Sequence, residues 1–274
     1  MPRRLCTLLL ALLVGALGAC QTTGGSADPG PEPRLQKILQ NRVLRVGLSG
    51  SQPPLNMRNA AGEIIGLEVD LIDALASSMG LETQLVTMPF AALLPALESG
   101  TVDLVISGMT ITPERNARVA FAGPYFISGK SVLAKAGTLA GAESPEVLDD
   151  ANRTYATLAG STSERFVKNW LPRSGLVTTP DYDSAIELVM QGKVDAMVAD
   201  YPICALTVLR YPEAGLTTFT TPFTVEPLGI ALPAGDPLFV NLVQNYLRTL
   251  EDTGVLTRFK AKWFSHGDWV NELP

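Results

Sequence analysis

The stretch Ser107-Gly108-Met109-Thr110-Ile111-Thr112-Pro113-Glu114-Arg115 and the residues on either side of it predict how the chain folds. Just before it, residues 102–106 have the sequence VDLVI, a mostly β-branched apolar run that predicts a short buried strand. Thr112, Pro113 and Glu114 are typical of a helix N-terminus, with a hydroxyl N-cap followed by proline and an acid in the first turn. The stretch therefore predicts a strand that opens through a loop into a helix.

This turn offers free backbone N–H groups, the hydroxyls of Ser107 and Thr110, and the guanidinium of Arg115. A carboxylate suits these groups best, because arginine can donate to two oxygens at once while N–H and O–H donors complete the shell. The alternative is an ordinary capped strand–helix turn whose arginine lies in water. The residues of the turn alone do not separate the two interpretations.

The composition indicates an ordinary globular protein. The chain has 274 residues, 46% of them hydrophobic and 18% charged, which suits one large domain or two of medium size. The formal net charge is −6 and no cluster of lysine and arginine occurs in the body of the chain. Nucleic acid and anionic membrane surfaces are therefore not expected as partners.

Residues 1–19 are expected to be a lipoprotein signal peptide. Arg3 and Arg4 precede an apolar core that is too short for a stable transmembrane span. The core closes on Leu17-Gly18-Ala19-Cys20, which resembles the lipobox of bacterial lipoproteins. The resemblance implies cleavage before Cys20 and attachment of lipid to its sulfur, whereas the alternative is an ordinary signal peptide with an incidental cysteine.

Residues 20–33 are rich in glycine, proline, serine and threonine, and they predict a flexible tether that holds the folded part away from a membrane. Cleavage would leave two cysteines, Cys20 and Cys204. Because Cys20 would carry the lipid, Cys204 has no disulfide partner, and this exported protein must depend on its core for stability.

The first half of the chain alternates between strands and helices. Strand 43–48 is followed by helix 67–79, strand 81–88, helix 89–98 and strand 102–106. The helix at 67–79 has a leucine or methionine at every fourth position, which is one stripe of an amphipathic helix. This alternation predicts a doubly wound, mostly parallel sheet.

A second series of the same kind follows. Its expected strands and helices are 154–158, 160–171, 176–178, 182–191, 194–199 and 203–210, and two further helices are expected at 237–250 and 255–264. The sequences GTVD at 100–103 and GKVD at 192–195 each join a helix to a strand. They indicate two lobes of similar construction.

Two extended apolar segments, 119–136 and 217–232, are expected to cross between the lobes. The predicted boundaries are 34–126 for the first part of lobe 1, 127–226 for lobe 2 and 227–274 for the C-terminal part of lobe 1. Two crossings between two lobes make a hinged clamp with its ligand in the cleft.

On these residues the chain resembles the family 3 extracellular solute-binding proteins, the polar amino-acid receptors of bacterial ABC importers. The resemblance runs from about residue 44 to 264, and it rests on the ordered segments LRVG (44–47), GLEVDL (66–71), LESGTVD (97–103), MTITPER (109–115), FAGPY (121–125), GSTSE (160–164) and KWF (262–264). It implies an α/β fold of the two-lobed, periplasmic-binding-protein-like type II, with two doubly wound sheets joined by a two-stranded hinge. It also implies an extracytoplasmic, monomeric, non-catalytic receptor that uses no cofactor or metal and serves an ABC permease.

The resemblance further implies the role of each site residue. Arg115 and Thr110 would hold the α-carboxylate of an amino acid, and Thr162 would add an N–H from the other lobe. Asp200 would pair with the α-ammonium, helped by the carbonyl of Gly108. An arginine fork facing a carboxylate across a dry cleft suits a zwitterion. The alternative role for Asp200 is that of a helix N-cap.

Selectivity for the side chain is where the chain departs from the family pattern. Many members have an aromatic residue at the position of Gln52, and receptors for basic amino acids often have an acid at the position of Ser49. Without that acid a cationic side chain would be buried unpaired, which is costly. Gln52 offers an amide to a polar side chain, and Phe90 offers an apolar wall, although a core role for Phe90 is the alternative. The expected ligand is a neutral or polar L-amino acid.

Two other functions are considered. A cleft converted into an enzyme, such as a dehydratase, would need an acid–base group beyond the pair Arg115 and Asp200. His266 is expected at the surface and Cys204 in packing, and no His/Cys cluster or phosphate loop is present in the sequence. A ligand-sensing domain would need a membrane-spanning partner segment, which this sequence is not expected to contain. The receptor is therefore the preferred function.

Overall fold

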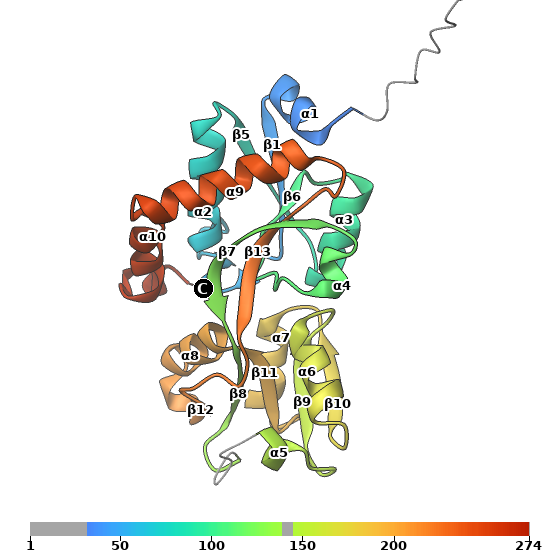
Figure 1. The fold of residues 1–274 in the computed structure, drawn as a ribbon. Coiled ribbons are helices and arrows are strands. Elements are labelled where there is room, and N and C mark those ends of the chain that lie inside the picture. The colour runs from blue at the N-terminus through green and yellow to red at the C-terminus, as the bar shows by residue number, and fades with distance from the viewer. Residues whose placement is uncertain (1–31, 139–144, 274) are drawn as a thin grey trace, which may run out of the picture. The chain divides into compact units, whose positions relative to one another are not determined.

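Two five-stranded sheets carry the fold, and two strands run between them (Figure 1). The computed structural model describes residues 32–138 and 145–273. The expected signal peptide, Cys20 and most of the tether lie outside the described residues.

The first sheet has the order β5 (Glu82–Thr87), β1 (Val43–Leu48), β6 (Leu104–Val105), β13 (Glu226–Leu232) and β7 (Ala120–Ser128). β5, β1 and β6 are parallel, whereas β13 is antiparallel to both β6 and β7. The sheet is therefore mostly parallel, as the alternation predicts, and the strand that returns from the second lobe is the one that runs in the opposite direction.

The second sheet has the order β10 (Gly175–Thr179), β9 (Thr154–Leu158), β11 (Ala196–Asp200), β8 (Lys130–Lys135) and β12 (Leu216–Thr218). β10, β9 and β11 are parallel, and β8 is antiparallel to β11 and β12. This sheet is also parallel along the βαβ series and antiparallel where the crossing segments join it.

A small antiparallel sheet is formed by β2 (Ser51–Gln52), β3 (Asn56–Arg58) and β4 (Ile64–Ile65). The turn between β3 and β4 contains Asn59 and Gly62, where the sequence predicts a hairpin.

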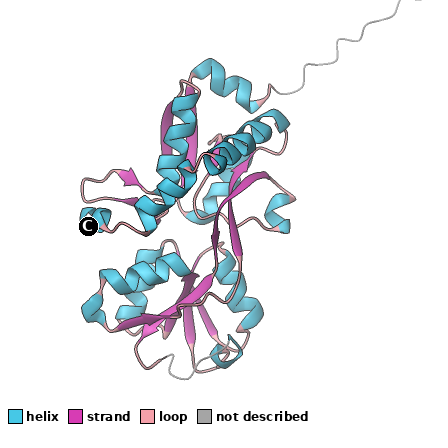
Figure 2. Ribbon diagram, turned by 60° about the vertical axis from the view of Figure 1, so that its left-hand side comes forward, coloured by secondary structure: helices cyan, strands magenta, loops and turns pink. Residues whose placement is uncertain are grey.

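Helices flank the strands of both sheets (Figure 2). The longer ones are α1 (Arg34–Asn41), α2 (Leu67–Ser78), α3 (Leu93–Ser99), α6 (Thr162–Trp170), α7 (Tyr182–Met190), α8 (Tyr201–Arg210), α9 (Pro237–Asp252) and α10 (Val255–Phe264). The short ones are α4 (Pro113–Asn116), α5 (Pro145–Leu148) and the 3-10 turns η1 (Phe90–Ala92), η2 (Pro212–Ala214) and η3 (Asp268–Glu272). Among the described residues, none of these helices combines the length and the apolar character needed to cross a bilayer.

The helix that the opening stretch predicts is present but short. Thr112 is its N-cap, with Oγ1 accepting from the backbone N–H of Arg115 at 3.3 Å, as the sequence predicts. α4 ends at Asn116 because β7 begins four residues later, at Ala120. The turn thus serves to aim Arg115 before the chain crosses to the other lobe.

The buried apolar side chains show how the lobes are built. The leucine stripe of α2, formed by Leu67, Leu71 and Leu75, is at most 1% exposed and packs into the core of the first lobe. A second group joins side chains of both lobes, including Leu93 of α3 and Tyr182 of α7. The two lobes therefore share apolar contacts beside the crossing strands.

In each lobe, an aspartate accepts a hydrogen bond from the backbone of the first strand of the βαβ series. Asp103 accepts from the backbone N–H of Arg45 in β1 at 2.9 Å, and Asp195 accepts from that of Thr154 in β9 at 2.7 Å. Asp103 is buried and also pairs with the guanidinium of Arg45 at 2.6 Å, whereas Asp195 is exposed. The two GxVD sequences thus occupy equivalent places, as the sequence predicts.

The turn after β6 is held from beneath by Glu68 of α2. Its carboxylate is fully buried and accepts from the N–H of Gly108 at 2.6 Å, from Nδ2 of Asn56 at 2.5 Å, and from the hydroxyl of Tyr125. Complete burial raises the pKa of Glu68, because it outweighs the three donors that favour the charged form. Gly108 therefore rests on a carboxylate whose charge depends on pH.

We predict that Asp103→Ala destabilises the protein more than Asp195→Ala. The first change leaves an N–H and a guanidinium without their buried carboxylate, at a cost of about 3 kcal/mol, whereas the second removes an exposed bond worth about 1 kcal/mol. Urea unfolding of both variants measures the difference. Equal losses of unfolding free energy in the two variants would show that the burial of Asp103 adds nothing to its contribution.

We also predict a pH-dependent effect of Glu68→Gln. Because the pKa of Glu68 is raised in the folded protein, the folded state keeps a proton that the unfolded chain releases above about pH 4.3. This stabilisation is fully present below the unfolded pKa and is lost as pH rises through the folded pKa. The stability advantage of the wild type over the variant should therefore shrink as the pH rises above the unfolded pKa and through the raised folded pKa.

Denaturant unfolding at several pH values tests this prediction, with the exposed Glu82→Gln as the matched control. The control should show no such trend. A constant difference between wild type and Glu68→Gln over the same range would contradict it.

Candidate functional site

A small enclosed cavity lies where the carboxyl end of β6 faces the start of α6 and the end of β11. Its volume is about 10 Å³, room for about one water molecule, and residues of both lobes line it: Gln52, Phe90, Gly108, Thr110, Arg115, Lys130, Leu158, Ser161, Thr162, Tyr182 and Asp200. We call this space the inner cavity. It brings together seven of the residues that the sequence singles out, namely Gln52, Phe90, Gly108, Thr110, Arg115, Thr162 and Asp200.

Arg115 reaches from α4 to both lobes. Its Nη1 donates to the carbonyl of Thr110 at 2.8 Å, and its Nη2 donates to the carbonyl of Gly160 at 3.2 Å. Burial and the nearby Arg165 lower the pKa of Arg115 to about 10, so it remains a cation at neutral pH. A ligand carboxylate in the cavity would meet a positive charge that is largely removed from water.

Hydroxyl donors stand beside this charge on both sides of the cavity. Oγ1 of Thr110 lies 3.3 Å from Oγ1 of Thr162, across the two lobes. Thr162 is the first residue of α6, whose N-cap Ser161 accepts from the N–H of Glu164 at 3.2 Å. Glu164 in turn accepts from the N–H of Gly160 at 2.7 Å, so the first turn of the helix is tied to the residue before its N-cap.

Asp200, the last residue of β11, is paired with a lysine that the sequence analysis does not identify. Nζ of Lys130 lies 2.6 Å from Oδ1 of Asp200 and 3.7 Å from Oε2 of Glu226. Lys130 is 1% exposed and Asp200 is 4% exposed. Burial raises the pKa of Asp200, and the nearby Lys130 opposes this shift.

The alternative role of Asp200 as a helix N-cap holds for its position but not for its side chain. Asp200 occupies the N-cap position of α8, but its side chain makes no capping hydrogen bond. The signal for Lys130 is present in the sequence as a single lysine at the start of the apolar run 130–134, inside a crossing segment. A charged residue at the start of a buried strand requires a partner of opposite charge, and that partner is Asp200.

Gln52 and Ser49 belong to a polar network around Ser107. Nε2 of Gln52 donates to the carbonyl and Oγ of Ser107, both at 2.9 Å, and to Oγ of Ser49 at 3.0 Å. Gln52 also lines the inner cavity, whereas Ser49 lines a neighbouring hollow together with Arg58 and Asp181. The structure therefore brings Gln52, but not Ser49, to the cavity.

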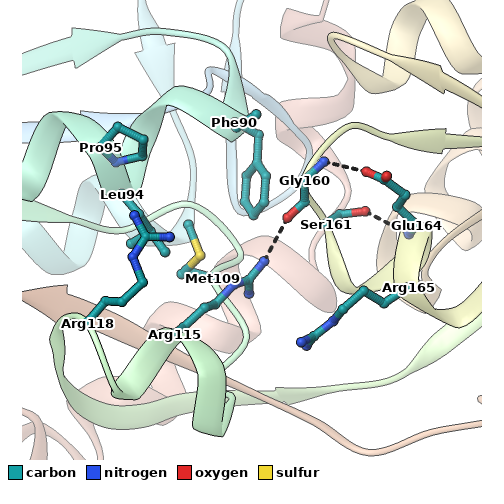
Figure 3. A pocket seen from close by; sticks show the side chains of 11 residues that line it. Phe90, Leu94, Pro95, Met109, Arg115, Arg118, Gly160, Ser161, Glu164 and Arg165 are labelled. Atoms are coloured by element: carbon teal, nitrogen blue, oxygen red, sulfur yellow. Dashed lines mark hydrogen bonds between the residues drawn. The ribbon is translucent and has the colours of Figure 1, made fainter.

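Phe90 separates the inner cavity from a wider outer pocket. Figure 3 shows its ring beside Gly160 and above Arg115, whose side chain points to the Gly160 carbonyl. Cζ of Arg115 lies 5.5 Å from the centroid of this ring, so the aromatic face also contacts the cation. Arg165 and Glu164 of α6 line the far side of this pocket.

Other reactive groups lie away from the inner cavity lining. Cys204 is buried, which raises the pKa of its thiol to about 12, and His266 is exposed near the C-terminus. Within residues 32–138 and 145–273, no group of three or more His, Cys, Asp or Glu side chains could hold a metal ion.

Known proteins of similar sequence and structure share this architecture. The chain is 27% identical to a cyclohexadienyl dehydratase of Pseudomonas aeruginosa, over 93% of this chain and 94% of that protein. It is 31% identical to the arginine-binding extracellular protein ArtP of Bacillus subtilis, over 97% and 99% of the two chains. The crystal structure of AncCDT-1, an ancestral amino-acid-binding protein and precursor of cyclohexadienyl dehydratase, matches with a TM-score of 0.78. The identity is 34%, and the match covers 84% of this chain and 99% of that one.

The sequence model of the bacterial extracellular solute-binding proteins, family 3, matches residues 44–266. The match spans both sheets and every element that lines the inner cavity, and it confirms the predicted family and two-lobed type II fold. The chain belongs to the bacterial extracellular solute-binding proteins of family 3.

Proposed function

We propose that this protein is an extracytoplasmic receptor that binds a small amino acid, or a closely related carboxylate, between its lobes and delivers it to an ABC permease. The observation that carries the proposal is the convergence of Arg115, Thr110 and Thr162 on one cavity lined by both lobes. Such a cavity can admit its ligand when the lobes part about the crossing strands and can enclose it when they close. The receptor acts as a monomer, since one chain supplies both sides of the cavity.

The proposed contacts follow the charges of the cavity. Arg115, Thr110 and the N-terminal N–H groups of α6 bind the ligand carboxylate. The family pattern assigns the α-ammonium to Asp200 and the carbonyl of Gly108, two residues that also line the cavity.

The ligand side chain is proposed to be neutral or polar. Phe90 supplies an apolar wall, and the Gln52 amide supplies a polar contact. Ser49 stands where receptors for basic amino acids often have an acid, so this chain has no carboxylate at that position for a cationic side chain.

A second candidate function is catalysis in the same cleft. The Pseudomonas aeruginosa relative is a cyclohexadienyl dehydratase, and an enzyme needs an acid–base group beyond Arg115 and Asp200. Lys130 is such a group, and it lines the inner cavity. Incubation with the substrate of that relative separates the two functions, because a receptor returns the compound unchanged and an enzyme turns it over.

We predict that Arg115→Ala weakens binding on the order of a hundredfold or more. Removing one partner of a buried charge pair typically costs about 3–5 kcal/mol, and about 1.4 kcal/mol corresponds to a tenfold change in affinity. A thermal-shift screen against the twenty amino acids and their 2-oxo and 2-hydroxy counterparts first identifies a ligand, and calorimetry then compares the variants.

The matched control is Arg173→Ala, because Arg173 is exposed and pairs with Asp149 at the surface. The control should bind like the wild type. Wild-type affinity in Arg115→Ala would show that the ligand binds elsewhere.

We also propose that the protein is anchored to a bacterial membrane through lipid on Cys20. The expected result of Cys20→Ser is loss of metabolic labelling with a fatty acid, because the sulfur that carries the lipid is gone. The chain should then be released or remain uncleaved. Labelling that persists in this variant would contradict the anchor, and Cys204→Ser serves as the control that keeps its label.

A further inference from the structure

The inner cavity already contains an ammonium group. Lys130 and Asp200 are register partners in the antiparallel pair β8–β11, so the sheet itself holds their side chains next to each other. Nζ of Lys130 lies 2.6 Å from Oδ1 of Asp200, and the two side chains are 2% and 5% exposed. Both residues line the cavity. Asp200, the carboxylate that the family pattern assigns to the ligand's ammonium, is therefore already paired with a lysine of the protein.

Glu226 does not replace Asp200 as the hydrogen-bond partner of Lys130. Its Oε2 is 3.7 Å from Nζ, which is too long for a hydrogen bond, whereas the contact with Asp200 is a short one. Glu226 accepts from Oγ1 of Thr224 at 3.0 Å and lines a groove outside the cavity, next to Pro227. Lys130 therefore donates to Asp200 and interacts with Glu226 over a longer distance.

The guanidinium of Arg115 is the charge in the cavity that lacks a counter-charge, because its hydrogen bonds go to two carbonyl oxygens. Lys130 is paired with Asp200, and Glu226 adds a second negative charge 3.7 Å from Nζ. A monocarboxylate supplies the counter-charge that Arg115 lacks. The ammonium of a zwitterion would have to share Asp200 with Lys130 in a space largely closed to water, where like charges repel strongly.

Lys130 also changes the hydrogen-bonding groups that the cavity offers to a ligand, from an acceptor to a donor. A free Asp200 only accepts, which suits an α-ammonium, whereas a lysine ammonium only donates. Nζ has three donors and the bond to Asp200 uses one of them. The donors that remain suit an oxygen on the α-carbon, as in a 2-oxo or 2-hydroxy acid.

We propose that Lys130 takes the place of the ligand's α-ammonium, so that the cleft selects small 2-oxo or 2-hydroxy carboxylic acids over the corresponding amino acids. This inference rests on the proposed function, because it names the class of carboxylate that Arg115 binds. Arg115 binds the ligand's carboxylate, and the pair Lys130–Asp200 recognises the substituent on the ligand's α-carbon.

The test is calorimetry of the full chain with matched sets of compounds that differ only at that carbon. Three sets are used: serine, hydroxypyruvate and glycerate; alanine, pyruvate and lactate; phenylalanine, phenylpyruvate and phenyllactate. In any set that binds, the oxo or hydroxy acid should bind at least tenfold more tightly than the amino acid. An amino acid that binds as tightly as its counterparts or more tightly overturns the inference, while binding that depends on Arg115 leaves the proposed function intact. If no compound of any set binds, the proposed function fails and the inference fails with it.

Lys130→Met tests the residue itself, because it removes the resident ammonium and frees Asp200. The preference should move at least tenfold toward the amino acids, and an unchanged preference overturns the role of Lys130. Lys135→Met is the matched control, since Lys135 lies at the exposed end of the same strand. If Lys130→Met does not fold, the double variant Lys130→Gln/Asp200→Asn removes both charges together and should abolish the wild-type preference, and its retention overturns the inference.

Discussion

The antiparallel pairing of β7 with β13 is the constraint on which the rest of the structure depends. These strands pair from Ser128 opposite Glu226 to the far end of the first sheet, and beyond Ser128 the chain enters the second sheet at Lys130. The same pairing holds the binding turn, because an irregularity in β13 lets the N–H of Gly229 donate to the carbonyl of Met109 at 3.0 Å. One pair of strands therefore joins the lobes, leads to Lys130 and anchors the loop that contains Met109 and Thr110.

The cleft is also where the protein buries charges, and it does so in matched groups. Lys130 is compensated by Asp200 and Glu226, and Glu68 is surrounded by three donors beneath the turn. Isolated charges could not remain ionised in such surroundings. Arg115 differs, because carbonyl oxygens rather than a carboxylate accept from its guanidinium. Its positive charge is thus the part of the cavity for which a ligand supplies the counter-charge.

Much of the fold follows from local signals. The amphipathic stripe of α2, the strand at 154–158 and the helices that begin at Pro237 and Val255 lie where the sequence predicts them, because periodicity and capping are properties of neighbouring residues. The antiparallel members of each sheet and the single turn of α4 were not predictable in this way. Both depend on where the chain enters and leaves a lobe.

The sequence by itself determined the family and the two-lobed architecture, since these depend on motifs that are contiguous in the chain. Tertiary structure alone decided which charge meets Asp200. Its partner Lys130 lies 70 residues away in sequence and is brought opposite it by the register of β8 and β11. A register is set by the packing of whole strands, and no local pattern of residues records it. For that reason the sequence predicts a carboxylate in the cleft, whereas only the fold shows that an ammonium from the protein already binds it.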